Sequence, residues 1–177
     1  FALIGTGFKY NITQWLVNLG ENGEKYMFTH NPRFGYLFFL SQMKSGDTRD
    51  MWNEVLKIIF YILAIIGIIV ISKQKTWWKK AAMLVSIIIL LPTNSGFYCG
   101  LYLFPIVVLF FNEEEHNWLD ILYMLSMIVI LNPFQLMTKK GVNITLTATN
   151  IAMFVFAGLL LIDNIVNFIR VLIEQHK

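Results

Sequence analysis

The chain has 177 residues, of which 56% are hydrophobic and only 14% are charged, and its mean hydropathy is +0.60. This composition excludes an ordinary soluble domain and predicts an integral membrane protein. The net charge of +3 at pH 7 comes mostly from lysines in short loops. It therefore indicates membrane lipid as a partner and gives no case for nucleic acid.

The segment 1–54 is the least lipid-like part of the chain and predicts an extracytoplasmic loop that contains short helices. Within it, residues 11–19 place their apolar side chains on one face, which is typical of an amphipathic helix lying flat on the outer leaflet. Residues 34–43 are apolar but too few to span a bilayer, which favours a re-entrant or interfacial helix.

The start of this second helix carries groups that bind ligands. Asn31 is a good N-cap, Pro32 suits a first helical turn, and His30 and Arg33 stand on either side. Two interpretations stay open. The basic residues form an anion site for a phosphate, or they anchor lipid headgroups beside a capped helix.

Five apolar runs follow, and each predicts one transmembrane helix of an all-α bundle over residues 55–162. The turn 92–96 interrupts them with polar and helix-breaking residues, so we expect it to lie within the membrane thickness and to face protein or water. Asn132 and Pro133 indicate a kink or a stop in the fourth run. The predicted spans are 55–72, 77–91, 96–111, 118–137 and 143–162.

Residues 163–177 predict an amphipathic helix that lies on the membrane surface, or a helix end that packs on its neighbours. Asp163 is an acidic residue embedded in an apolar run, and we expect it to be exposed at the membrane boundary.

The densest basic loop, residues 73–80, sets the predicted orientation. By the positive-inside rule this loop is cytoplasmic, with Trp77 and Trp78 at headgroup depth. Segment 1–54 then lies outside and the C-terminus inside. The low Cys content and the many Ile, Lys and Asn residues favour an AT-rich bacterium, so we expect the bacterial cytoplasmic membrane.

Residues typical of metal or cofactor chemistry are sparse. His30, His116 and His176 lie in separate segments without metal-binding spacing, and no Gly-rich phosphate loop is present, so we expect neither a metal nor a cofactor. Cys99 stands alone in an apolar setting and predicts a small packing residue.

Polar residues gather at the expected outer ends of the spans, and hydroxyls and amides at that depth either join helices or line a sugar site. They are Thr93, Asn94, Ser95 and Tyr98 at the turn, and Asn143, Thr147 and Asn150 on one face of the fifth span. In the predicted topology both groups converge with residues 30–33 in one cavity.

The order of these segments resembles the second half of GT-C class membrane glycosyltransferases, and most closely glycosyltransferase family 87, the polyprenyl-phosphate-sugar-dependent mannosyl- and arabinosyltransferases. The resemblance covers roughly residues 10–111. It is carried by the amphipathic segment 11–19, by HNPRFGYLFFLSQM at 30–43 and by LLPTNSGFYCGLYLFP at 90–105. The Asn-Gln/Phe-Ser of the family is Asn-Pro-Arg in this chain.

The resemblance implies transfer of a sugar from a polyprenyl-phosphate donor to a glycan or lipid acceptor on the outer face. It implies that the departing phosphate is held by Arg33, His30 and Lys9, and that the sugar contacts come from Asn31, Asn94, Ser95 and Tyr98. In the family the catalytic acidic residue belongs to the first outer loop. We therefore expect it outside this chain, in an N-terminal half or a partner subunit.

The alternative, from a different class, is a non-catalytic multi-spanning subunit of a polysaccharide polymerase, flippase or transporter complex. Proton-coupled carriers keep acidic pairs near the membrane midplane, and the apolar runs contain no such pair. An acidic outer loop upstream of Phe1 would favour the transferase, and a true start at Phe1 would favour the subunit.

Overall fold

The computed structural model describes residues 13, 34–43, 46–90, 97–114, 116–132 and 144–175, and no strand occurs in these ranges. The all-α prediction is therefore confirmed for them. In chain order the helices are α2 (Tyr36–Ser41), α3 (Asp47–Val70), α4 (Trp77–Leu90), α5 (Phe104–Phe111), α6 (Trp118–Ile130) and α7 (Ile144–Gln175), with 3-10 helices η1 (Ile71–Lys73) and η2 (Phe97–Leu103).

Two helices are long and apolar enough to cross a membrane. One is α3 together with η1, which has 27 residues and a mean hydropathy of 2.8, and the other is α7, which has 32 residues and a mean hydropathy of 2.0. The apolar helices 99–111 and 118–130 are shorter than a span. The described residues thus contain two helices of spanning length, where the sequence predicts about five.

Helix α3 begins at Asp47 rather than at residue 55, so the predicted loop 1–54 includes its first turns. Asp47 and Asp50 lie in the first turn, where their negative charges interact favourably with the helix dipole. The hydrophobic pattern misses this polar start because it detects only the lipid-like part of a helix.

Helix α2 begins at Tyr36, directly after Gly35, whose φ of 84° lies in the left-handed region that favours glycine. The prediction that Asn31 caps this helix and Pro32 occupies its first turn is therefore wrong. A backbone in the left-handed region cannot continue a right-handed helix, so Gly35 separates α2 from residues 30–33. Of the predicted helix 11–19, only Thr13 is described.

Helices α4, α5 and α6 lie within the predicted apolar runs, but their first or last residues differ from the predicted bounds. Helix α4 ends one residue before the predicted boundary. The predicted span 96–111 begins as the 3-10 helix η2 and becomes α-helical only at Phe104, beside Pro105 in the first turn of α5. Helix α6 ends at Ile130, short of residue 137, because Pro133 disfavours helical backbone before it.

Helix α7 is continuous from Ile144 to Gln175, so the predicted fifth span and the predicted amphipathic tail are one helix. The sequence after Gly158 contains no proline or glycine that would interrupt it. Asn164 is fully buried, so the start of the tail packs on neighbouring elements instead of lying on a membrane surface.

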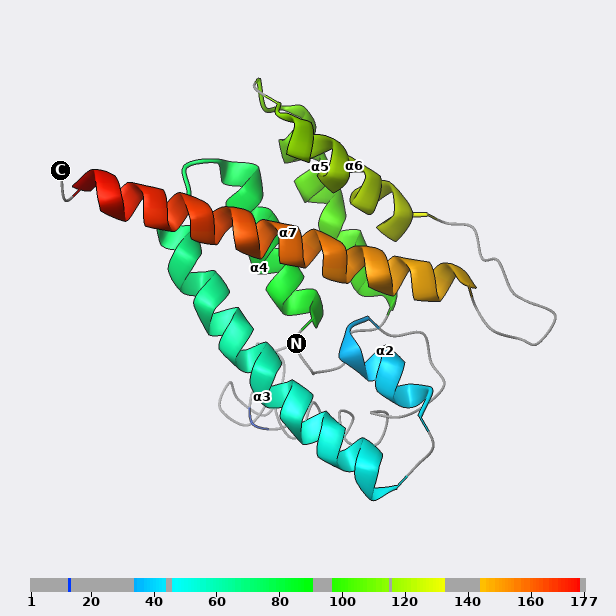
Figure 1. Ribbon diagram of the computed structural model, residues 1–177. Coiled ribbons are helices and arrows are strands. Elements are labelled where there is room, and N and C mark those ends of the chain that lie inside the picture. The colour runs from blue at the N-terminus through cyan, green and yellow to red at the C-terminus, as the bar shows by residue number, and fades with distance from the viewer. Residues whose placement is uncertain are drawn as a thin grey trace.

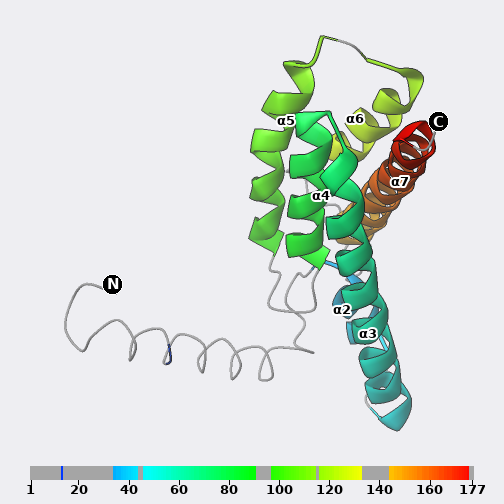
Figure 2. The ribbon, with the colours of Figure 1, turned by 90° about the vertical axis from the view of Figure 1, so that its left-hand side faces the viewer.

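Helix α7 lies across the bundle and contacts α3, α4 and α6 (Figure 1). Figure 2 shows α4 and α5 side by side, while the N-terminal half of α3 extends beyond them with α2 alongside. The rings of Trp78, Tyr123 and Phe156 join α4, α6 and α7 in the core, with centroids 5.2 Å and 5.8 Å apart.

The two tryptophans of the basic loop have different environments. Trp78 is 1% exposed and packs inside the bundle, which corrects the prediction that it faces lipid headgroups. Trp77 is 73% exposed, and the ammonium group of Lys80 lies 4.9 Å from its ring centroid. Cys99 is buried in the hydrophobic core, as predicted for a packing residue.

Candidate functional site

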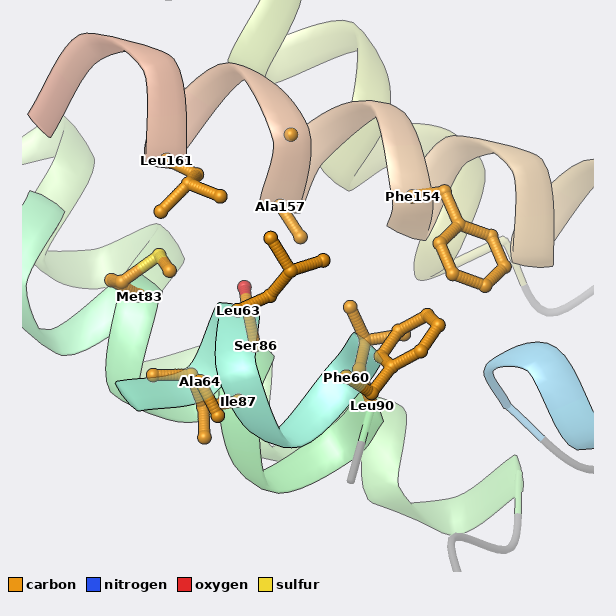
Figure 3. A pocket seen from close by; sticks show the side chains of 11 residues that line it. Phe60, Leu63, Ala64, Met83, Ser86, Ile87, Leu90, Phe154, Ala157 and Leu161 are labelled. Carbon is orange, nitrogen blue, oxygen red and sulfur yellow. The ribbon is translucent and has the colours of Figure 1, made fainter. Parts of the chain in front are cut away.

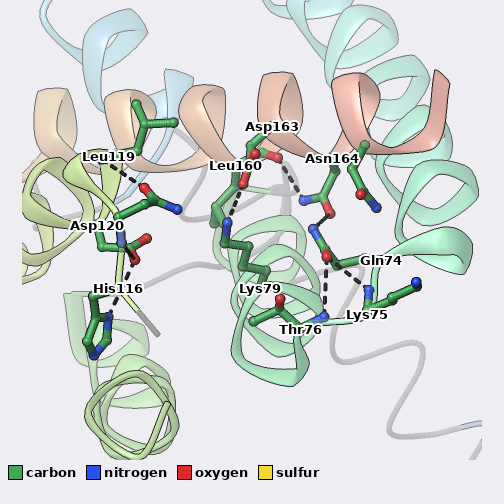
Figure 4. A network of polar contacts seen from close by, with 12 residues as sticks. Gln74, Lys75, Thr76, Lys79, His116, Leu119, Asp120, Leu160, Asp163 and Asn164 are labelled. Atoms are coloured by element: carbon green, nitrogen blue, oxygen red, sulfur yellow. Dashed lines mark hydrogen bonds and ion pairs between the residues drawn. The ribbon is translucent and has the colours of Figure 1, made fainter. Parts of the chain in front are cut away.

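A polar network lies at the end of the bundle that carries the basic loop (Figure 4). The side-chain amide of Gln74 donates to Asn164 Oδ1 at 2.9 Å, and Gln74 Oε1 accepts from the backbone N–H groups of Lys75 and Thr76 at 2.9 and 3.2 Å. Asn164 in turn donates to the backbone carbonyl of Leu160 at 2.7 Å. Gln74 thereby ties the loop before α4 to the middle of α7.

An ion pair reinforces this connection. Lys79 Nζ lies 2.7 Å from Asp163 Oδ2, and the two side chains are only 12% and 24% exposed. Asp163 is therefore held against α4 and is not the freely exposed group that the sequence predicts. An acidic residue in an apolar run requires such a partner, because an unpaired buried charge is costly.

A second acidic residue, Asp120, stabilises the start of α6. Its Oδ2 accepts from the backbone N–H of Asn117 at 2.7 Å, while Asn117 Oδ1 accepts from the N–H of Leu119 at 2.9 Å. This reciprocal arrangement is a capping box. His116 Nδ1 lies 3.4 Å from the same Asp120 oxygen. The His116 side chain is 40% exposed, so it covers the buried Asp120 carboxylate from the solvent side.

The opposite end of α7 contacts the segment that follows the predicted phosphate site. The backbone N–H of Gly35 donates to Asn150 Oδ1 at 2.8 Å, and both groups are buried. Gly35 also lies against the backbone of Leu90 at the end of α4, and Gly100 of η2 lies against the ring of Phe34. This end of the bundle therefore brings together residues that flank the segment 30–33, residues that flank the turn 92–96, and the polar face at the start of α7.

The predicted site residues themselves belong mostly to the part of the chain that is not described. Lys9, His30, Asn31, Arg33, Asn94 and Ser95 lie outside the described residues. Tyr98 belongs to η2, but its side chain is outside the description. Asn150 of the predicted polar face is described and joins two elements, the first of the two roles that the sequence left open.

Sequence reasoning did not find the network around Lys79, Asp163 and Gln74. The available signal was Asp163 with Asn164 inside a long apolar run, because ionisable groups at membrane depth are almost always paired. The nearest candidates for a cationic partner were the lysines of the basic loop. Among the ranges that the structure describes, no group of three or more His, Cys, Asp and Glu residues is arranged to hold a metal ion.

Comparison of the chain with protein-family models, with curated proteins and with solved structures found no match.

Proposed function

We propose that the chain is embedded in a bilayer, the cytoplasmic membrane of a bacterium, with the basic loop inside. Support comes from α3, because only 11% of its most apolar window is buried. The core helix of a soluble protein would be mostly covered. Instead, Ile58, Ile62, Ile65 and Ile69 are all more than half exposed, and such a surface requires an apolar surrounding.

Within that membrane, we propose that the chain is part of a GT-C-like glycosyltransferase that moves a sugar from a polyprenyl-phosphate donor to a glycan or lipid acceptor on the outer face. The observation that carries this proposal is the hydrogen bond between Gly35 and Asn150. It holds the chain directly after His30 and Arg33 against α7, while Leu90 and Gly100 hold both flanks of the turn 92–96 beside it. Residues that flank the segment 30–33 and the turn 92–96 thus lie beside Asn150 of α7, which supports one ligand site built from these three parts of the chain.

The proposed chemistry is displacement at the anomeric carbon. A general base removes the proton of the acceptor hydroxyl, the acceptor oxygen bonds to the anomeric carbon, and the bond from that carbon to the phosphate oxygen breaks. Arg33, His30 and Lys9 would stabilise the phosphate that leaves. Asn31, Asn94, Ser95 and Tyr98 would contact the sugar, where several moderate hydrogen bonds are wanted.

The buried carboxylate of Asp120 and the partly buried carboxylate of Asp163 are not candidates for the base. Asp163 is paired with Lys79, and Asp120 caps α6. Both contacts lie at the end of the bundle that carries the basic loop, opposite the Gly35–Asn150 contact. The base would therefore be another acidic residue of the protein or of a partner subunit. The same observation favours the alternative of a non-catalytic subunit of a polysaccharide polymerase, flippase or transporter complex.

Release of polyprenyl phosphate tests the proposal without knowledge of the acceptor. Membranes containing the protein would be supplied with a panel of polyprenyl-phosphate hexoses and pentoses, and the free lipid phosphate would be measured. We expect release with one donor, and a loss of at least tenfold in Arg33→Ala with membrane insertion unchanged. Lys75→Ala, at the basic end, is the matched control and should keep full activity.

Undiminished release by Arg33→Ala would refute the phosphate assignment. Absence of release with every donor, from protein that binds none of them, would favour the non-catalytic subunit.

A further inference from the structure

Helices α3, α4 and α7 enclose an apolar pocket of about 150 Å³ (Figure 3). Its walls are hydrocarbon side chains such as Leu63 of α3, Met83 of α4 and Phe154 of α7. The one polar side chain in the lining is that of Ser86, in the middle of α4. No residue of the polar network around Lys79 lines the pocket.

The hydroxyl of Ser86 is unusual because it has no hydrogen-bond partner among the described residues, although the residue is only 1% exposed. Serine and threonine inside helices ordinarily donate to the carbonyl four residues earlier. Ser126 does so to Leu122 at 2.8 Å, and Thr149 does so to Thr145 at 2.8 Å. A buried hydroxyl without a partner costs free energy, which a bound group can recover.

The pocket opens toward the lipid-facing surface of α3. Leu63 lines the pocket and is also 38% exposed, so it stands at the opening. On the opposite wall, a Cβ atom at Gly158 would meet nothing within 4 Å. The pocket therefore reaches the surface beside Leu63 and has free space at Gly158, which suits a narrow flexible group.

We propose that this pocket binds an unsaturated acyl chain of a bilayer phospholipid, with a double bond beside the Ser86 hydroxyl. A cavity of this volume holds about six carbon atoms, since an apolar cavity of about 150 Å³ accommodates benzene. Ser86 lies about 13 Å along α4 from Trp77, near the middle of a ~30 Å hydrocarbon core. Chains reach that depth, and headgroups do not.

The double bond is assigned because of Ser86. A saturated chain offers the hydroxyl no acceptor, whereas the π electrons of a double bond accept a weak hydrogen bond. The contact is weak, so we expect about a twofold preference for the unsaturated chain. The inference rests on the proposed membrane embedding and is independent of glycosyl transfer.

Photo-crosslinking in nanodiscs tests the site. The probe is a phosphatidylcholine with a diazirine in the middle of one acyl chain, and the adducts are mapped by peptide mass spectrometry. We expect adducts concentrated at Leu63 and Met83 in the wild type. Gly158→Leu places a side chain in the lining of the pocket, at a position where a Cβ meets nothing within 4 Å, and should lower this labelling at least fivefold. Ile151→Leu, on the exposed face of the same helix, should not.

The outer face of α3 supplies the internal control for embedding. Ile65 should be labelled equally in every variant, because it faces the bulk lipid. Equal pocket labelling of wild type and Gly158→Leu, with Ile65 labelled, would overturn the pocket site alone. Loss of labelling at Ile65 would overturn the embedding and the pocket together.

Competition between lipids tests the contact with the double bond. Unlabelled phosphatidylcholine with a cis double bond at mid-chain should displace the probe about twice as well as a fluid, fully saturated branched-chain lipid. Ser86→Ala should abolish this preference and keep the pocket labelling. Ser126→Ala, which removes a back-bonded hydroxyl, should retain the preference. A preference that survives in Ser86→Ala would overturn the assigned contact.

Discussion

Breaking the ion pair between Lys79 and Asp163 should destabilise the bundle far more than the loss of an exposed lysine from the same basic loop. At 2.7 Å, two unit charges in a medium with an effective dielectric constant of about 20 attract each other by about 6 kcal/mol. Desolvation of both groups offsets much of this attraction, which leaves a net coupling of about 2 kcal/mol. Lys79→Met leaves the Asp163 carboxylate without its cation in a largely buried position.

We expect the free energy of unfolding of this variant to fall by about 3 kcal/mol, the lower end for a broken buried pair, because the Asp163 side chain is 24% exposed and water can partly solvate it. Asp163→Leu should lose a similar amount. The double variant should lose at least about 2 kcal/mol less than the sum, since no unpaired charge remains. Lys75→Met, which removes an exposed lysine, should stay within about 0.5 kcal/mol of the wild type.

The assay is denaturant unfolding in a fixed detergent, combined with thermal melting. A loss of 3 kcal/mol corresponds to a decrease in Tm of roughly 6–12 °C for a chain of this size. The coupling should change little between low and high salt, because the pair is mostly shielded from solvent. Single-variant losses that add to within about 0.5 kcal/mol would refute the reasoning.

Three further predictions concern packing and topology. Gly67→Val should cost about 1–3 kcal/mol, because the added carbons force the side chains of Met83 and Ile87 on α4 to shift. Gly158→Ala has open space and should gain up to about 1 kcal/mol, and both changes are measured by unfolding. Asn150→Leu should cost about 1–3 kcal/mol by leaving a buried backbone N–H without its acceptor, and an unchanged Tm would contradict this. Cysteines at Met43 and Lys75, which precede and follow the 24-residue helix α3, should react with an impermeant maleimide from the outer and the cytoplasmic side, respectively. Same-side labelling would disprove that α3 crosses the membrane, and the reversed pattern would disprove the orientation.

The sequence by itself determined where the long helices lie, because a long apolar run is a local property. Helix α4 ends one residue from its predicted boundary, and the core of α3 coincides with the first predicted span. Helix ends were less predictable, since they depend on single residues that act against the pattern. Gly35 delays the start of α2, and Pro133 shortens α6.

The candidate sites, like the helices, were predictable from the sequence only in part. Sequence patterns selected Asn150 as one of the polar groups at the end of the fifth span, and its hydrogen bond to Gly35 joins residues that are 115 positions apart. The pattern did not reveal which of its two proposed roles Asn150 has. The phosphate and sugar assignments at Arg33 and Asn94 stay predictions, because those residues lie outside the described ranges.

Only the tertiary structure decided which polar and aromatic groups become partners. Trp77 and Trp78 are adjacent and chemically identical, yet only Trp78 turns toward Phe110 and Tyr123. Asp163 pairs with Lys79, which is 84 residues away along the chain. Helical periodicity fixes the direction of a side chain relative to its own helix axis, but the element it meets depends on how helices pack around one another, which no local pattern encodes.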